Sequence, residues 1–448
     1  LHLDPVRARR YKFGSTLIHG LNGSLRAIDL ATSKMVNPIM LREISIQFVK
    51  PVFQEETVEV FIGKLSVDKI SIELHKDGKR VQIIDISFEV LKDTTPNMRY
   101  STYWKGGLAN PQELLIEDIG DLRGELKLQW DELAFEAVFP SLKKMIPDVQ
   151  CSTLLGTTKI VGMICPGLNS VYASLRLKFR ASSENSVSSL NYRVVSSDAR
   201  FSRVVMSIHN SVGEGEIEAF FRPPPVQQAT YTSICGLLND NRFAGRNALI
   251  IGGSRGIGEV IAKLLAAGGA NSVITYANGK EDADCVEKEI TQSGGCCKVV
   301  PYNVLSGERN IVFNAFEGMI THIYYLASPL VGKSDSALWD HAAFSNYCRY
   351  YVQGLADLLA PLVQNKDYRR SDLAIFVPST VFLNEAGQGF GEYVAAKSAA
   401  EVFCTQVRLK CPSWTLEVPR LPRLLTDQTS AVVNARPLET AKTILEYL

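Results

Sequence analysis

The stretch from Asn247 to Lys263 constrains the fold of this chain more than any other. It reads Asn-Ala-Leu-Ile-Ile-Gly-Gly-Ser-Arg-Gly-Ile-Gly-Glu-Val-Ile-Ala-Lys. A short apolar run stops at two glycines, and after them apolar residues recur at helical spacing, at Ile257, Ile261, Leu264 and Leu265. The pattern predicts a strand, a tight turn and a helix, as at the start of a parallel α/β sheet.

The glycines in this stretch favour a phosphate-binding loop. Gly252 permits the tight turn, Gly256 lets the backbone approach a pyrophosphate, and Gly258 lets the helix pack on the strand. The alternative for this pattern alone is a plain tight turn that binds nothing. If it is a nucleotide site, the residues expected to contact a dinucleotide are Gly252, Ser254, Arg255, Gly256, Ile257 and Gly258.

A second motif favours the nucleotide site. Tyr393-Val394-Ala395-Ala396-Lys397 puts Tyr393 and Lys397 four positions apart, on one face of a helix. Together the two motifs resemble the short-chain dehydrogenase/reductase family, from about residue 243 to the end. The resemblance implies an α/β Rossmann domain over residues 244–448 and an oxidoreductase of the 3-oxoacyl ketoreductase type.

The resemblance also implies roles for individual residues. A cation close to a phenol lowers its pKa from about 10, so Tyr393 beside Lys397 could donate a proton as hydride reaches a carbonyl carbon. Lys397 would also hold the nicotinamide ribose. The carbonyl-holding hydroxyl lies thirteen residues before the tyrosine, at 393 − 13 = 380, which selects Thr380 with Ser379 adjacent. Asn346 would anchor a water relay to the lysine; its alternative is an ordinary amide on a helix surface.

The second strand of this domain favours NADP(H) over NAD. An NAD site places an acid about twenty residues past the first glycine, but here the strand ends in Tyr276-Ala277-Asn278. Arg255 could meet a 2′-phosphate, or could be a solvated turn residue, and an acid at Glu281 or Asp282 could still reach the ribose. Tyr276 and Asn303, where the family has an adenine-contacting Asp, complete the expected cofactor site.

Two segments depart from the pattern of this family. Residues 323–328, Ile-Tyr-Tyr-Leu-Ala-Ser, replace the usual Asn-Asn-Ala-Gly that supports the cofactor. Residues 419–427 replace the Pro-Gly-x-x-x-Thr segment and bring two arginines near the expected substrate entrance. These departures put the geometry of the site in question more than its chemistry.

The first half of the chain reads as a duplicated antiparallel sheet. A buried helix is expected over 15–31, followed by alternating strands up to Leu91 and a hairpin at Asp77-Gly78. Residues 44–48 and 175–179 share a pattern at a constant offset, since 175 − 44 = 131 and 179 − 48 = 131. We therefore expect repeats over 1–93 and 129–222, joined by an irregular bridge over 94–128.

The start of the first repeat carries a second resemblance. His2-Leu3-Asp4-Pro5, Phe13-Gly14 and Ile18-His19-Gly20 resemble the (R)-specific enoyl-CoA hydratase, or MaoC-like, hot-dog family. The resemblance implies an α+β double hot-dog fold with His2 as a catalytic histidine and the Gly20 amide polarising a thioester carbonyl. The aspartate partner of His2 would lie five residues upstream, before residue 1. The alternative is a frayed terminal His2 and a His19 that only caps its helix.

Composition narrows the remaining possibilities. The net charge of +1 gives no basic excess for nucleic acid or an anionic membrane. The nine cysteines include no Cys-x-x-Cys and suggest reduced thiols in a cytoplasmic protein. No charge-free apolar run is long enough for a membrane span. Successive prolines begin a linker over 223–243, because proline cannot donate to a strand ladder.

These features predict a bifunctional enzyme that acts on acyl-CoA or acyl carrier protein thioesters. A ketoreductase would interconvert 3-oxoacyl and 3-hydroxyacyl forms with NADP(H), and a hydratase/dehydratase would interconvert (R)-3-hydroxyacyl and trans-2-enoyl forms, as in fatty acid or polyketide biosynthesis. We expect a homo-oligomer without a metal. One alternative is a ketoreductase whose hot-dog half only binds acyl chains, and another is a nucleotide-sensing scaffold without hydride transfer.

Overall fold

The chain divides into two units, Leu1–Pro224 and Pro225–Leu448, and each is described by itself. The computed structural model describes all residues except 1, 3, 12, 64–65, 92–109, 129–130, 181–186, 239, 307, 335, 337, 386–388 and 431–435. The division falls between two prolines of the proline-rich segment. The first part of the predicted irregular bridge, residues 94–109, lies outside the described residues.

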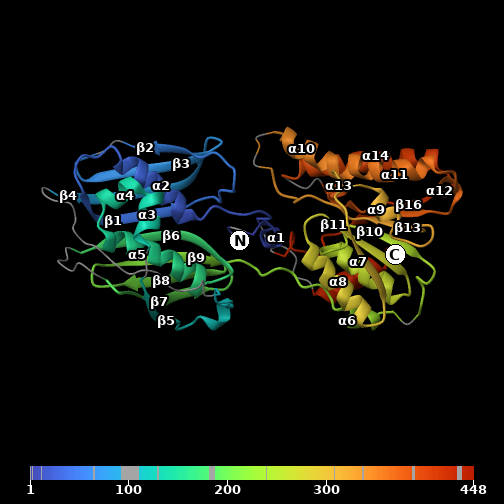
Figure 1. The fold of residues 1–448 in the computed structure, drawn as a ribbon, viewed down its shortest axis with the longest axis horizontal. Helices are drawn as coiled ribbons and strands as arrows, with labels where there is room; N and C mark the ends of the chain where they lie inside the picture. Colours follow the sequence, from blue (N-terminus) through green and yellow to red (C-terminus); the bar gives the residue numbers. More distant parts are fainter. Residues whose placement is uncertain are drawn as a thin grey trace. The chain divides into compact units, whose positions relative to one another are not determined.

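An antiparallel sheet forms most of the first unit (Figure 1). Nine strands among the described residues pair in the order β2-β3-β4-β1-β6-β9-β8-β7-β5. Their bounds in chain order are β1 (Ile39–Phe48), β2 (Glu59–Ile62), β3 (Lys69–Lys76), β4 (Lys79–Val90), β5 (Arg123–Lys127), β6 (Ser170–Phe179), β7 (Ser189–Asp198), β8 (Arg203–His209) and β9 (Gly213–Phe221). Asp77 and Gly78 both take positive φ between β3 and β4, which confirms the predicted hairpin.

The centre of this sheet carries the internal offset seen in the sequence. Strands β1 and β6 pair so that Ser45 lies opposite Arg176, and 176 − 45 = 131. Ile44 lies opposite Leu177, and Ile46 opposite Leu175. The strands then follow in mirrored order, β4-β3-β2 beyond β1 and β9-β8-β7 beyond β6. The pairing therefore relates the two halves of the sheet by an approximate two-fold axis beside Ser45.

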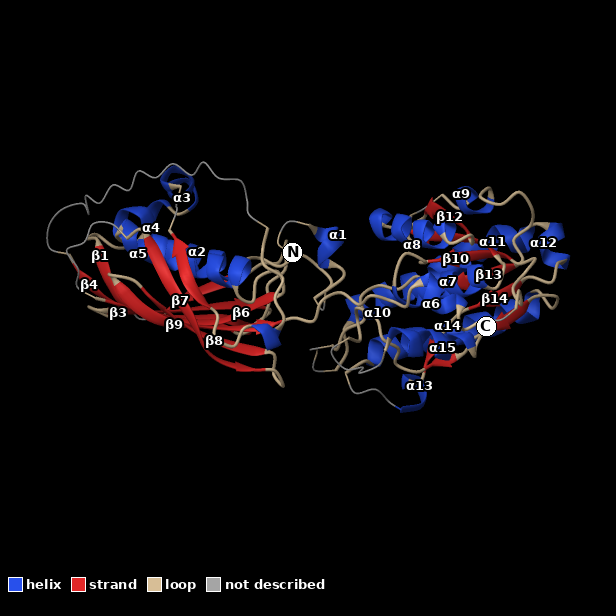
Figure 2. Cartoon of the chain, turned by 90° about the horizontal axis from the view of Figure 1, so that it is seen from below, coloured by secondary structure: helices blue, strands red, loops and turns tan. Residues whose placement is uncertain are grey.

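Helices cover this sheet and complete its core (Figure 2). Alternate residues of β1 point inward, so that Ile44 and Ile46 are fully buried and pack with α2 and α5. The predicted helix begins later than expected, at Gly20, because Leu17 pairs with Phe53 in an isolated bridge. The helices are α1 (Pro5–Ala8), α2 (Gly20–Thr32), α3 (Glu132–Val138), α4 (Pro140–Met145) and α5 (Asp148–Lys159), with a 3₁₀ turn at Ile116–Asp118 and a π turn at Ile160–Ile164.

The second unit is a parallel α/β sheet. Its six described strands pair in the order β12-β11-β10-β13-β14-β16, as in a doubly wound Rossmann fold. The strands are β10 (Asn247–Ile251), β11 (Asn271–Tyr276), β12 (Cys296–Pro301), β13 (His322–Tyr325), β14 (Ala374–Phe376) and β16 (Thr415–Glu417), and a separate pair joins β15 (Ser379–Thr380) to β17 (Arg420–Leu421).

Helices lie on both faces of this parallel sheet, which explains why β10 is apolar throughout. Ala248 and Ile250 pack against α7, whereas Leu249 and Ile251 pack against α11 and α14. The helices are α6 (Tyr231–Cys235), α7 (Gly256–Ala267), α8 (Lys280–Gln292), α9 (Asn310–Phe313), α10 (His341–Cys348), α11 (Gly354–Gln364), α12 (Lys366–Arg370), α13 (Phe382–Glu385), α14 (Gly391–Lys410) and α15 (Pro437–Leu445), with a π turn at Arg349–Gln353. Within the described ranges, no helix is long and apolar enough to cross a membrane.

Candidate active site

The glycine loop follows β10 and turns directly into α7. Gly252 has φ +84°, a conformation that favours glycine. A Cβ at Gly258 would lie 2.1 Å from the Gly252 carbonyl oxygen, so only glycine allows this close approach of helix and turn. The Gly252 and Gly253 amides donate to Thr275 Oγ1 and Thr275 O, each at 3.0 Å. Thr275, which fixes the loop from the end of β11, was not predicted from the sequence.

Arg255 lies at the start of α7 and forms an ion pair. Its Nη1 is 3.2 Å from Asp427 Oδ2, and Asp427 Oδ1 accepts from the Val226 amide at 2.8 Å. Asp427 therefore holds the side chain that was expected to meet a 2′-phosphate. Thr426, beside it, lies close to Gly256. The other predicted loop residues differ in burial: Ser254 is buried and Ile257 is half-buried.

Tyr276 and Asn303 lie near the carboxyl ends of β11 and β12. Tyr276 is half-buried and its carbonyl oxygen accepts from the Tyr302 amide at 2.8 Å. Asn303 Oδ1 accepts from the Leu305 amide at 2.9 Å, so this oxygen is engaged within its own turn. Both residues lie at the strand ends where a parallel sheet holds its ligands.

Tyr393 and Thr380 lie together on α14 and β15. The Thr380 side chain hydrogen-bonds the Tyr393 phenol, whereas Ser379 Oγ donates to Glu401 Oε1 at 2.5 Å. The Tyr393 ring packs edge-on against Tyr347 and other aromatic rings. Burial raises the pKa of Tyr393, although the hydrogen bond from Thr380 opposes this.

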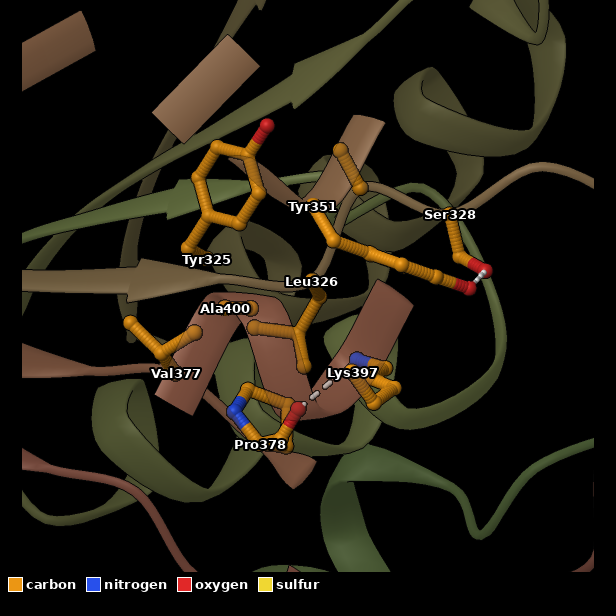
Figure 3. A pocket seen from close by; sticks show the side chains of 9 residues that line it. Tyr325, Leu326, Ser328, Tyr351, Val377, Pro378, Lys397 and Ala400 are labelled. Carbon is orange, nitrogen blue, oxygen red and sulfur yellow. Dashed lines mark hydrogen bonds between the residues drawn. The ribbon is translucent and has the colours of Figure 1, made fainter. Parts of the chain in front are cut away.

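Lys397 lies on the same helix as Tyr393. Its Nζ donates to Pro378 O at 2.8 Å and lies 4.0 Å from the centroid of the Tyr351 ring (Figure 3). Burial lowers the pKa of Lys397 to about 8. In this arrangement the lysine contacts a carbonyl and a ring, and burial raises the pKa of Tyr393. The expectation that Lys397 lowers that pKa stays a prediction.

Asn346 is not brought to this site. It is exposed on α10, while the next residue, Tyr347, is buried against Tyr393. After the π turn, Tyr351 contacts Lys397 and its hydroxyl lies 2.7 Å from Ser328 Oγ. The role of Asn346 as the anchor of a relay to the lysine stays a prediction. A run of tyrosines at 347, 350 and 351 was the available signal for the true contact.

A pocket lies beside Lys397, at the carboxyl ends of β13 and β14 (Figure 3). The segment that replaces the family's Asn-Asn-Ala-Gly forms one side of it. The lining residues are Tyr325, Leu326, Ala327, Ser328, Tyr351, Val377, Pro378, Lys397 and Ala400. Burial raises the pKa of Tyr351 well above its usual value, so its hydroxyl remains a neutral donor.

The first unit holds the other predicted catalytic residues, His2 and Gly20. The His2 residue is exposed, but its Nδ1 lies 2.7 Å from Leu17 O, which fixes the proton on Nδ1 if it donates. Its ring centroid is 5.0 Å from that of His19, the residue before α2. Burial lowers the pKa of both histidines, that of His19 to about 4. Gly20 packs so closely that a Cβ would lie 2.8 Å from the Phe48 ring.

Comparisons with known proteins concern the second unit. Residues 246–422 match the family described as short chain dehydrogenase. Versicolorin reductase from Emericella nidulans is 36% identical over 89 residues, which cover 20% of this chain and 33% of that protein. The 3-oxoacyl-[acyl-carrier-protein] reductase of Staphylococcus epidermidis is 26% identical over 162 residues, which cover 34% of this chain and 64% of that one.

A solved structure shows a weaker likeness. The angucycline C-6 ketoreductase LanV with bound NADP is 17% identical, covering 46% of this chain and 90% of that chain with a TM-score of 0.41. The chain spans between a third and about two thirds of the length of these curated relatives. The family match over residues 246–422 and the order of the parallel strands both support a domain of the short-chain dehydrogenase/reductase type in the second unit.

Proposed function

We propose that the second unit is an NADP(H)-dependent ketoreductase that converts a 3-oxoacyl thioester to its 3-hydroxyacyl form. The observation that carries the proposal is the contact of the Thr380 side chain with the phenol of Tyr393, which lies on the same helix as Lys397. Tyr393 donates a proton to the carbonyl oxygen of the substrate, and the Thr380 hydroxyl holds that oxygen. The relatives named as 3-oxoacyl-[acyl-carrier-protein] reductases support a thioester as the substrate class.

The residues of the glycine loop fit a dinucleotide. A Cβ at Gly258 would fill the space on which the turn depends, and free amides at the start of a helix such as α7 favour an anion. Gly252 to Gly258 would hold the pyrophosphate, and Arg255 would hold a 2′-phosphate after exchanging Asp427 for it. The bound cofactor supplies the hydride. The end of β11 at Tyr276 offers no carboxylate for a ribose 2′-hydroxyl, which favours NADP(H).

Lys397 must change partners for this chemistry. It now donates to Pro378 O, and its buried charge is unfavourable enough to lower its pKa to about 8. The ribose hydroxyls of a bound cofactor would offer Lys397 other acceptors. The cation would then lower the pKa of Tyr393, which burial raises in the present arrangement.

The proposal is tested by measuring the rate at which the full chain oxidises NADPH with acetoacetyl-CoA as the substrate. We expect turnover in the wild type and a loss of about 10²- to 10⁴-fold in Tyr393→Phe, the range for a missing general acid. Tyr368→Phe is a matched control, because its hydroxyl accepts from the Ile320 amide far along the sheet from Tyr393. No turnover, or equal rates in wild type and Tyr393→Phe, would favour a nucleotide-sensing scaffold.

A second activity is proposed for the first unit: a double hot-dog hydratase/dehydratase acting on (R)-3-hydroxyacyl and trans-2-enoyl thioesters. The favouring observation is that His2 donates from Nδ1 to Leu17 O, which leaves Nε2 as a base for water, beside the start of α2. Water then adds its hydroxyl to C3 and a proton to C2. The Gly20 amide would hold the thioester oxygen.

Hydration of crotonyl-CoA by the full chain measures this second activity. We expect His2→Gln to lower the rate by about 10²-fold or more. His209→Gln is the control, because His209 is exposed at the end of β8. An unchanged rate in His2→Gln, or no hydration by the wild type, would leave only an acyl-binding role for this unit.

A further inference from the structure

Arg222 is a buried guanidinium that has no carboxylate partner among the described residues. It follows β9 directly and is only 7% exposed. Within the described part of the chain it forms no ion pair, and its Nε is buried without a hydrogen-bond partner. Its Nη2 donates to the Leu168 carbonyl oxygen at 3.0 Å. By contrast Arg203, on the neighbouring β8 and 42% exposed, pairs with Glu218.

The surroundings of Arg222 contain a second unsatisfied group. The Arg222 amide donates to Asn169 O at 2.7 Å, which holds the loop before β6 next to the end of β9. Asn169 is 4% exposed, and its Oδ1 is also buried without a partner. On the other side the Arg222 Cζ lies 4.6 Å from the centroid of the Tyr11 ring. Buried polar groups are nearly always hydrogen-bonded, so these two atoms indicate a ligand or ordered water.

Arg222 also lies within electrostatic reach of the His2 site. Burial lowers the pKa of His2, and the charge of Arg222 adds to this effect. His2 is in turn in ring contact with His19, at the start of α2. Arg222, which directly follows β9 of the second repeat, therefore adds a positive charge that acts on His2 of the first repeat.

We propose that Arg222 binds the carboxylate of a small carboxylic acid in the first unit. A carboxylate has two oxygens in the spacing of the guanidinium fork, and it neutralises a charge that no described protein group neutralises. The Tyr11 ring covers the guanidinium and excludes water from that side.

Binding of two small isosteres to the full chain tests this proposal without requiring turnover. Crotonate carries a carboxylate, and crotonamide has the same shape without the charge. Calorimetric titration of the wild type is expected to show saturable binding of crotonate about tenfold or more tighter than that of crotonamide. Equal binding of both compounds, binding of neither, or binding of inorganic phosphate in place of crotonate would overturn the proposal.

Two arginine variants separate recognition from folding. Arg222→Gln is expected to lose the preference for crotonate while crotonamide binding stays unchanged, and Arg203→Gln is expected to keep the wild-type preference. If circular dichroism shows that Arg222→Gln is unfolded, Arg222→Lys preserves the charge and should retain a weaker preference for the anion. A preference that survives in a folded Arg222→Gln, or that is lost equally in Arg203→Gln, contradicts the assignment. Since no reaction is measured, failure here is distinguishable from failure of either proposed activity.

Discussion

Desolvation shifts the pKa values of the groups proposed for proton transfer in opposite directions in the two units. In the second unit burial raises the pKa of Tyr393, so the phenol keeps its proton and can act as an acid. In the first unit burial lowers the pKa of His2 and His19, so the imidazoles stay neutral and can act as bases. A low-dielectric environment favours the neutral form in each case. A neutral phenol has a proton to donate, whereas a neutral imidazole has a free nitrogen that can accept one.

The buried cations of the two units, Lys397 and Arg222, differ in how readily they lose their charge. Lys397 is held by a carbonyl and an aromatic ring and has a pKa lowered to about 8, so its charge can be lost. Arg222 remains protonated at neutral pH even though burial lowers its pKa to about 10. A lysine can therefore respond to cofactor and pH, whereas a buried arginine requires an anion.

Gly258→Ala is expected to give the largest difference in ligand binding between the two units. Its new Cβ would meet the Gly252 carbonyl oxygen at 2.1 Å, so the loop must shift. Such overpacking costs about 1–3 kcal/mol of stability, and we expect NADPH binding to weaken beyond about 100-fold, measured by calorimetry. Crotonate binding to the first unit should be unaffected. Gly332→Ala, with no atom within 4 Å of the added carbon, is the control, and equal losses in both variants would contradict the account.

The pH dependence should differ in direction between the units. Lys397 is charged below about pH 8, so kcat/KM for the reductase should fall at higher pH, by about tenfold per unit. Hydration should instead be lost on the acidic side, below the ordinary histidine pKa of 6.5, because the pKa of His2 is lowered. Profiles of kcat/KM for NADPH oxidation and crotonyl-CoA hydration measure both limbs. If kcat/KM of both reactions fell on the same side of neutral pH, the contrast between the two units would be contradicted.

Removal of the ring beneath Lys397 should have a smaller effect. Tyr351→Leu deletes a cation–π contact worth about 1–2 kcal/mol when desolvated, so kcat/KM of the reductase should fall about tenfold. Tyr351→Phe keeps the ring and loses only the hydroxyl contact with Ser328, so we expect its rate to stay near that of the wild type. Steady-state kinetics distinguish the two, and a greater loss in Tyr351→Phe would show that the hydroxyl matters instead.

The smallest effect is expected from Asp427→Asn. The variant keeps an oxygen for the Val226 amide but removes the charge that holds Arg255. A freed Arg255 should lower the KM for NADPH about threefold, a partly exposed ion pair being worth up to about 1 kcal/mol, and leave the KM for NADH unchanged. A parallel fall in both KM values would argue against competition for Arg255.

Local patterns predicted those parts of the fold that depend on neighbours in sequence. The glycine loop was recognisable because Gly252 and Gly258 are required by the turn itself, and the offset of 131 was readable because alternation repeats along paired strands. The start of α2 was misjudged since Leu17 fits a helical face but pairs with Phe53 instead.

Side-chain direction was the part that sequence could not supply. Asn346 stands at a plausible position, but a π turn and the packing of Tyr347 and Tyr351 decide which residues face Lys397. Arg222 resembles any arginine after a strand until the lack of a paired carboxylate is visible. Thr275 was missed for the same reason, because its contact with the glycine loop joins two strands.

The most direct measurement of the central claim follows one deuterium through both proposed reactions. The full chain is mixed with acetoacetyl-CoA and NADPH deuterated at the transferred position, and the products are analysed by mass spectrometry. The account predicts 3-hydroxybutyryl-CoA with deuterium at C3, and crotonyl-CoA that retains it, because dehydration removes hydrogen from C2. Unlabelled acetoacetyl-CoA as the sole acyl species would contradict the oxidoreductase assignment.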